Sequence, residues 1–276
     1  MWKSFTIVKI MLVLSLIHTL PAQAGLLISP LRAMLNERDR STAITLINSG
    51  DSPRTYRVSW TEKRVTSTGQ YIALTEEEMK TFPIASPILR ISPRQVTLAP
   101  NQRQTVKIAA RRPKGLADGE YRSHLTFTVL PKKNTEAELE GATGIKLNVL
   151  LNYSIPVIFR QGKLKHKSTI KAVELVNNKN TGMVNMKVKM LHAGKASTAG
   201  SIYAYWTPNG SKNETLVGTL NSVNFFPDVS ERTFTLMGQK FTPKKGKLRV
   251  IHKGKKEFSG EVFDEKTFNF SAKDIH

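Results

Sequence analysis

Short runs of β-forming residues, separated by turn residues, constrain this chain more than any other feature of its sequence. The runs are rich in Val, Ile, Thr, Tyr and Phe, and Gly, Pro, Asn and Asp stand between them. Residues 42–47 end at the turn-forming residues 48–51, and residues 121–129 alternate apolar with polar side chains. Only residues 76–79 indicate a helical turn. Strands at this spacing predict an all-β chain built from β-sandwiches.

The predicted strands fall into two groups, which we interpret as two β domains. The joint between them is the polar, Gly-containing segment 160–163, which follows an apolar strand. The domains are therefore expected at residues 25–160 and 161–276. Each is long enough to bury a hydrophobic core of its own. The chain has no cysteine, so no disulfide contributes to its stability.

The N-terminal residues have the pattern of a secretory signal peptide. Lys3 and Lys9 precede an apolar run over residues 10–20, and Ala22 and Ala24 supply the small side chains that signal peptidase recognises. A membrane anchor is the alternative, but the run is about half of the roughly 20 residues that span a bilayer. We therefore expect residues 1–24 to be removed. No later run is long and apolar enough to cross a membrane, so the mature chain is not expected to span one.

The chain is strongly basic, with a formal net charge of +21 at pH 7. Such a charge favours acidic partners or a negative membrane surface, or it serves solubility alone. Nucleic acid is not expected as a partner, because a secreted protein rarely meets it.

Nothing in the sequence predicts catalysis. The six histidines are scattered, and the H-E-x-x-H, G-x-S-x-G and P-loop patterns do not occur. The absence of cysteine excludes thiol catalysis and thiolate metal sites. We expect no catalytic residue, no metal and no cofactor, so a chelator should change neither folding nor partner binding.

Residues 131–160 are the most informative part of the chain. They begin with a long polar loop, residues 131–144, and loops of this length in compact domains are usually functional or disordered. The run that follows has large apolar residues at every second position: Ile145, Leu147, Val149, Leu151 and Tyr153. This row either faces the sandwich core or forms an exposed apolar edge that pairs with a partner chain. Pro156, which lacks an N–H, is compatible with an edge strand.

Three blocks of the sequence resemble the periplasmic pilus (fimbrial) chaperones. They are residues 28–35, residues 89–106 and residues 118–125. The resemblance covers residues 26–160 well and residues 161–276 only loosely, and the arginine-rich blocks are most similar to the non-classical (archaic or sigma-type) branches. It implies two immunoglobulin-like β-sandwich domains set at an angle, with a cleft between them.

The resemblance also implies a mechanism and two partners. Members of the family hold pilin subunits by donor-strand complementation, in which an edge strand of the chaperone fills the groove left by a missing pilin strand. The subunits then pass to an outer-membrane usher, which places the chain in the periplasm. Ile145, Leu147, Val149 and Leu151 would fill successive pockets of the pilin. Each contributes roughly 1.5–3 kcal/mol on burial, or on the order of 6–12 kcal/mol together before ordering costs.

An anchor for the C-terminal carboxylate of the pilin is a further implication, because it would fix the register of the added strand. Two cations form this anchor in classical members of the family, and Arg32 matches the first, an arginine of the first strand. The second cation is a lysine near the end of the donor strand, but this sequence has Pro156 there. Arg90, Arg94 and Arg103 remain alternative second cations.

Classical members of the family also carry a salt-bridge network between the domains. Lys107 and Glu120 match its first-domain positions with suitable charges, so we expect a structural role for both. The second-domain acid has no match near His252 and Lys253.

A secreted immunoglobulin-like adhesion or carbohydrate-binding module, or a pilus subunit, is the alternative function. A pilin would carry an apolar donor segment near its mature N-terminus, yet Arg32 interrupts residues 25–35. A carbohydrate binder would expose aromatic platforms, whereas Trp60 and Trp206 lie in predicted strands and are expected in the cores. The sequence therefore favours the chaperone.

Overall fold

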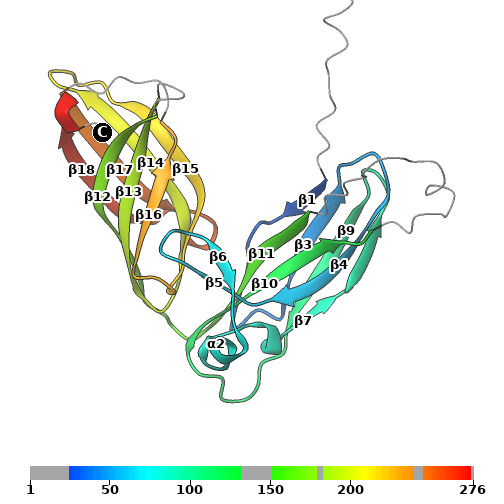
Figure 1. Ribbon diagram of the computed structural model, residues 1–276. Helices are drawn as coiled ribbons and strands as arrows, with labels where there is room; N and C mark the ends of the chain where they lie inside the picture. The colour runs from blue at the N-terminus through cyan, green and yellow to red at the C-terminus, as the bar shows by residue number, and fades with distance from the viewer. Residues whose placement is uncertain (1–24, 132–150, 179–182, 239–244, 275–276) are drawn as a thin grey trace, which may run out of the picture.

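The computed structural model describes residues 25–131, 151–178, 183–238 and 245–274 of the chain, and the predicted signal peptide lies outside them. Two β-sandwiches make up this part of the chain and meet at an angle, like the arms of a V (Figure 1). Strands account for 63% of the described residues and helices for 6%, which confirms the predicted all-β fold of two immunoglobulin-like sandwiches.

The first sandwich consists of a four-stranded and a five-stranded sheet. The four-stranded sheet contains, in spatial order, β1 (Leu26–Ser29), β3 (Ser41–Asn48), β9 (Arg103–Ala110) and β7 (Leu89–Ser92). The five-stranded sheet contains, in spatial order, β2 (Ala33–Asn36), β11 (Asn152–Gln161), β10 (Gly119–Val129), β4 (Arg54–Thr61) and β8 (Gln95–Leu98). All neighbours are antiparallel except β2 and β11, which are parallel.

Alternating apolar side chains build the core of the first sandwich. Ile44 and Leu46 of β3 are fully buried, and so are Leu125 and Phe127 of β10. Alternation alone would leave the other face of β10 to solvent, but His124 on that face is only 2% exposed. The reason is that a hairpin covers this face.

The covering hairpin consists of β5 (Lys63–Val65) and β6 (Tyr71–Ala73) and reaches into the space between the two arms (Figure 1). Its Tyr71 ring stands edge-on to the imidazole of His124, with 5.2 Å between the ring centroids. The hairpin therefore gives the first sandwich a third layer on the side that faces the second sandwich.

A short helix follows the hairpin at the base of the V (Figure 1). The helix α2 (Glu76–Thr81) begins with a capping box, in which the side chains of Thr75 and Glu78 each accept a hydrogen bond from the other's backbone N–H. The predicted helical turn is confirmed. A single 3-10 turn, η1 (Ser86–Ile88), leads into β7.

The second sandwich consists of a three-stranded and a four-stranded sheet. The three-stranded sheet contains, in spatial order, β12 (His166–Asn178), β13 (Met183–Gly194) and β16 (Glu231–Leu236). The four-stranded sheet contains, in spatial order, β15 (Thr215–Phe225), β14 (Thr198–Pro208), β17 (Gly246–Gly254) and β18 (Val262–Phe270). Two 3-10 turns, η3 (Lys256–Phe258) and η4 (Ala272–Asp274), follow β17 and β18.

The core of the second sandwich also follows from alternation. Met186 and Val188 of β13 are fully buried, and half-exposed lysines stand between the buried positions. Trp206 is buried, as predicted for a core residue. Trp60, in contrast, is only partly buried and packs at the margin of the first core.

The two sandwiches are joined by a short segment and by side-chain contacts. β11 ends at Gln161 and β12 begins at His166. A separate apolar cluster lies where the sandwiches meet, formed by Met34, Val65 and Ile158 of the first sandwich and Phe226 of the second. We refer to this region as the joint.

Candidate functional site

The outer edge of β11 is only half covered in the described part of the chain. β10 pairs with one side of β11 along its whole length. On the other side, β2 pairs only with residues 157–160. The N–H of Leu26 in β1 donates to the Tyr153 hydroxyl at 3.5 Å, but β1 belongs to the other sheet and does not pair with β11. The uncovered backbone can therefore accept another strand.

The predicted apolar row leads directly into this open edge. Leu151 is 59% exposed, which is high for a large apolar side chain. Tyr153, the next member of the row, is partly buried against the first core. Ile145, Leu147 and Val149 lie outside the described residues. The row thus begins to leave the core between Tyr153 and Leu151.

Arg32 lies between β1 and β2, where the chain crosses from one sheet of the first sandwich to the other. It is only 5% exposed and reaches the second sandwich. Its guanidinium pairs with the carboxylate of Glu257 and donates a hydrogen bond to the Ser197 hydroxyl at 3.2 Å. Its Nε–H has no partner among the described residues.

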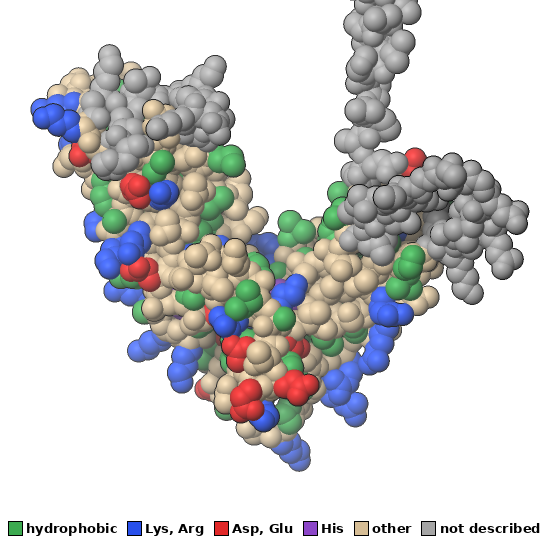
Figure 2. All heavy atoms as spheres, in the orientation of Figure 1, with side chains coloured by type: hydrophobic (Ala, Val, Ile, Leu, Met, Phe, Trp, Pro, Cys, Tyr) green, Lys and Arg blue, Asp and Glu red, His purple; other side chains and the backbone are tan. Residues whose placement is uncertain are grey.

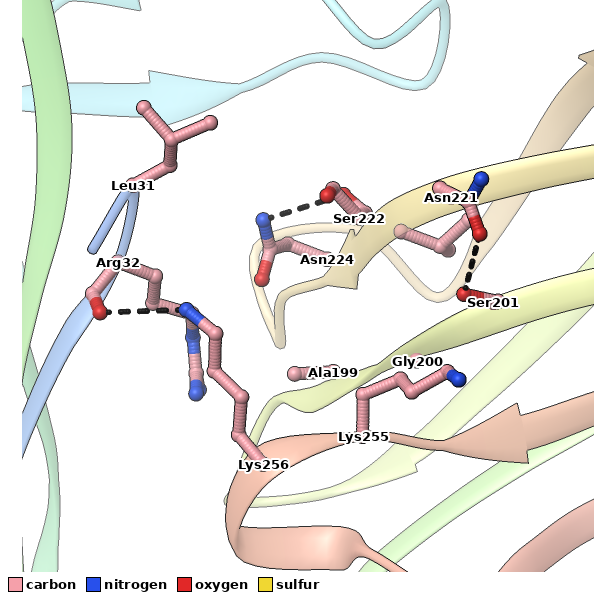
Figure 3. A pocket seen from close by; sticks show the side chains of 11 residues that line it. Leu31, Arg32, Ala199, Gly200, Ser201, Asn221, Ser222, Asn224, Lys255 and Lys256 are labelled. Atoms are coloured by element: carbon pink, nitrogen blue, oxygen red, sulfur yellow. Dashed lines mark hydrogen bonds between the residues drawn. The ribbon is translucent and has the colours of Figure 1, made fainter. Parts of the chain in front are cut away.

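A pocket of about 220 Å³ opens beside Arg32 between the two sandwiches (Figure 3). Lys255 and Lys256 of the second sandwich line it together with Arg32. The Lys256 ammonium donates to the backbone carbonyl of Arg32 at 3.4 Å, and burial together with the nearby Arg32 charge lowers the pKa of Lys256. Three cationic side chains from the two sandwiches therefore line one cavity, and Glu257 is the acid that pairs with Arg32. Because cationic side chains bind carboxylates, the cavity suits a carboxylate ligand.

A second set of contacts at the joint is centred on Glu120 of β10. Its Oε2 accepts hydrogen bonds from Arg160 Nε at 2.8 Å and from the backbone N–H and hydroxyl of Ser197, both at 2.9 Å. Arg160 in turn donates to the Ser197 carbonyl at 2.7 Å. Ser197 belongs to the second sandwich, so this buried carboxylate ties the two sandwiches together.

A third set of contacts connects Arg122 of β10 with Asp228 of the second sandwich. Both guanidinium Nη atoms donate to the carboxylate, with 2.9 Å between Nη1 and Oδ1. Asp228 also accepts the backbone N–H of Val65 at 2.7 Å, which holds the hairpin in place. The guanidinium carbon stands 4.1 Å from the ring centroid of Phe226. This bidentate, nearly water-free pair is the geometry that arginine and aspartate favour.

Comparison with known protein families identifies the chain. The family model described as pili and flagellar-assembly chaperone, PapD N-terminal domain, matches residues 25–165, just over half of the sequence. The chain belongs to the pilus and flagellar-assembly chaperones. The family is one of chaperones rather than enzymes, in line with the prediction from the sequence.

Solved structures of pilus chaperones are similar to this chaperone over most of its length. The YadV chaperone is 13% identical, with 90% of this chain and 100% of that chain covered and a TM-score of 0.46. The CupB2 chaperone of Pseudomonas aeruginosa is 11% identical, with 89% and 99% covered and a TM-score of 0.45. The SafB chaperone in complex with the SafA pilin of Salmonella enterica is 14% identical, with 89% and 96% covered and a TM-score of 0.44. The search of curated proteins found no match.

The chaperone fold brings some of the predicted site residues together and separates others. Arg32 and Glu120 both lie at the joint and both contact Ser197. Lys107 is exposed on β9, and its ammonium makes no hydrogen bond or ion pair among the described residues. Arg90 and Arg94 line a different cavity, between β4 and β7, and not the pocket beside Arg32.

Several residues at the joint of the chaperone were not predicted from the sequence. Glu257 and Asp228 are the second-domain acids, and Glu257 follows closely after His252 and Lys253, where no acid was expected. They pair with residues more than 100 positions away, so no local spacing connects them. The only signal in the sequence was that acidic residues are rare in this chain, which has 21 of them against 42 basic residues.

Two further properties concern the described residues alone. No group of histidine, aspartate and glutamate side chains among them could hold a metal ion. No helix in the described ranges has the length and apolar character needed to cross a bilayer.

Proposed function

We propose that this chaperone binds pilin subunits by donor-strand complementation, using β11 and the residues that precede it. The observation that supports this best is the uncovered edge of residues 152–156, next to the exposed Leu151. A strand added there continues the five-stranded sheet beyond β11. The solved complex of a related chaperone with the SafA pilin agrees with such a partner.

The apolar row supplies the affinity and the specificity of the added strand. Ile145, Leu147, Val149 and Leu151 enter successive pockets of the pilin, and the main chain pairs with its sheet. Because a shift of one residue would turn the whole row away from those pockets, binding requires a fixed register.

The pocket beside Arg32 fixes that register by holding the C-terminal carboxylate of the pilin. The Nε–H of Arg32 is buried without a partner among the described residues, and Lys255 and Lys256 line the pocket beside this side chain. Lys256 takes the role of the second cation, which the sequence left open between Arg90, Arg94 and Arg103. In this arrangement the second cation comes from the second sandwich and not from the donor strand.

The remaining parts of the proposal concern the compartment and the second partner. The predicted signal peptide over residues 1–24 directs the chaperone to the periplasm, and cleavage leaves a chain that begins near Gly25. The two domains meet at residues 160–163. The loaded chaperone delivers its pilin to an outer-membrane usher.

Copurification with a pilin tests this proposal. The tagged mature chaperone is co-expressed with the pilin genes that neighbour its own, and the double variant Leu147→Asp, Val149→Asp is compared with the wild type. The matched control is Lys146→Asp, Asn148→Asp, which adds acids to the opposite face of the same segment. We expect capture of a small β-protein by the wild type and the control, and its loss with the first variant. Equal capture by all three proteins would move the binding edge elsewhere.

A further inference from the structure

A second cavity lies on the first sandwich, at the end of the sheet opposite to β11. It measures about 500 Å³, within the roughly 300–1,000 Å³ typical of ligand pockets. Arg57 of β4, Arg90 of β7 and Arg94 just before β8 line it, together with the partly buried Trp60. No acidic residue is among its lining residues.

The three arginines of this cavity have no carboxylate partner among the described residues. Arg57 and Arg94 are exposed and make no hydrogen bond or ion pair through their guanidinium groups within the described ranges. Arg90 donates only to the backbone carbonyls of Pro87 and Leu89. Most of their donors therefore remain available to another molecule.

The arginines at the joint behave differently. Two of them are buried and a third is partly buried, and each has an acidic partner: Arg32 with Glu257, Arg122 with Asp228 and Arg160 with Glu120. These three ion pairs give the arginines at the joint a structural role. The unpaired arginines around the second cavity therefore contribute charge without a structural role, either for solubility or for a ligand.

Two features favour a ligand over solubility alone. The arginines converge on one cavity that also holds an aromatic ring, and arginine with tryptophan is the composition of binding hot spots. The backbone beside them is also available, because β8 pairs with β4 only over Arg54–Arg57. The backbone N–H of Val58 donates to the Arg94 carbonyl at 2.8 Å. The pairing of β4 with β8 ends at Arg57, so the later residues of β4 have no strand partner on that side among the described residues.

We propose that this cavity is a docking site for an acidic, extended segment of a partner protein. Its carboxylates pair with Arg57, Arg90 and Arg94, and one of its side chains packs against Trp60. Planar carboxylates match the forked donors of arginine, and an extended chain follows the direction of β4. Basic side chains gather along the outer margin of this arm in the space-filling view (Figure 2).

The site is separate from the edge that we propose for pilin binding. β4 and β8 form one end of the five-stranded sheet, and β2 and β11 form the other. A partner can therefore occupy the arginine cavity while a pilin strand is paired with β11. The inference does not depend on the proposed function, because the two edges share no residue.

Peptide binding tests the inference on the full mature chain. The probe is a short fluorescein-labelled peptide of alternating Glu and Thr, and its Kd is measured by fluorescence anisotropy. The triple variant Arg57→Gln, Arg90→Gln, Arg94→Gln is compared with Arg111→Gln, Arg112→Gln, Lys114→Gln. The second variant removes the same charge from an exposed segment between β9 and β10. We expect the first variant to weaken binding about tenfold or more and the second to change it about twofold or less.

Each outcome decides the question. If both variants weakened peptide binding equally, net charge would explain the effect and the proposed docking site would be wrong. Unchanged peptide binding by the first variant would also contradict the proposal. Inorganic phosphate that displaces the peptide at equal concentration would show a general anion site. If the first variant lost binding to phosphatidylglycerol vesicles but still bound the peptide, the arginines would belong to a membrane-binding surface and the proposed docking site would be overturned. Since the substituted side chains are exposed, unchanged circular dichroism is expected for both variants and separates binding from folding.

Discussion

At the scale of single residues, the joint depends on buried charged side chains that form ion pairs and hydrogen bonds across it. Glu120, Arg122 and Arg32 are each less than 10% exposed, and each contacts the second sandwich. A buried ion pair contributes little net stability when intact, but removing one partner leaves an uncompensated charge. The joint should therefore be sensitive to single substitutions that change only charge.

Glu120→Gln tests this sensitivity, because the amide keeps the shape of the side chain and removes its charge. Arg160 then loses its carboxylate partner in a nearly dry site. We expect the free energy of unfolding in urea to fall by about 3 kcal/mol. The control is Glu77→Gln, whose partner Lys80 is solvent-exposed, and it should change little. Equal small effects from both variants would argue against a structural role for Glu120.

His124 makes the stability of the chaperone depend on pH. Burial, with the charges of Arg122 and Lys63, lowers the pKa of its imidazole from 6.5 to about 3. The unfolded chain therefore binds the proton at a higher pH than the folded chain, and stability is lost as the pH falls from about 6.5 towards 3. The loss attributable to this residue is roughly 1.4 kcal/mol per pH unit in that window.

Replacement by phenylalanine isolates this contribution. Both ring nitrogens of His124 lack a hydrogen-bond partner among the described residues, so His124→Phe removes the titration without breaking a hydrogen bond. Urea unfolding measured between about pH 7 and pH 4 should show a shallower decline for the variant than for the wild type. Parallel declines would mean that His124 is not the titrating group.

At the scale of elements, the sequence predicted regular strands well and irregular ones poorly. The run at residues 42–47 became β3, because its apolar residues alternate and a turn follows it. β15 was not predicted, because two bulges interrupt its pairing with β14 and its sequence lacks a continuous alternation. The hairpin was also missed, since its short strands gain their order from contacts with His124 and Asp228 that lie far away in the sequence.

Gly69 at the tip of the hairpin gives a test of its contact with the second sandwich. Its φ is +88°, and a Cβ there would stand 2.3 Å from the guanidinium of Arg232. Gly69→Ala should cost about 1 kcal/mol for the backbone alone, plus the displacement of Arg232 from the Asn224 carbonyl.

The matched control for the hairpin is Gly115→Ala. Its φ is +73°, but a Cβ there meets no atom within 4 Å. Urea unfolding should therefore show a larger loss of stability for the Gly69 variant than for the Gly115 variant. Equal losses would indicate that the hairpin tip does not bear on the second sandwich.

At the scale of the whole molecule, the sequence predicted two sandwiches but not the contacts that hold them together. Strand periodicity is local and can be read along the chain, and this yielded the all-β fold. The pairing of Arg32 with Glu257 and of Arg122 with Asp228 depends on how the two arms pack. The proposal of Lys256 as the second cation likewise required the fold, because Lys256 and Arg32 line one pocket only through the packing of the two arms.

If the open edge of β11 accepts a strand from a pilin, amide hydrogen exchange along that edge will slow when the pilin binds. Exchange is compared between the free chaperone and its purified complex with a pilin. Binding should slow exchange at residues 145–156, of which residues 152–156 form the edge that β2 leaves uncovered, and should leave the β4 edge unchanged. Protection at the β4 edge with no change at residues 145–156 would contradict this prediction.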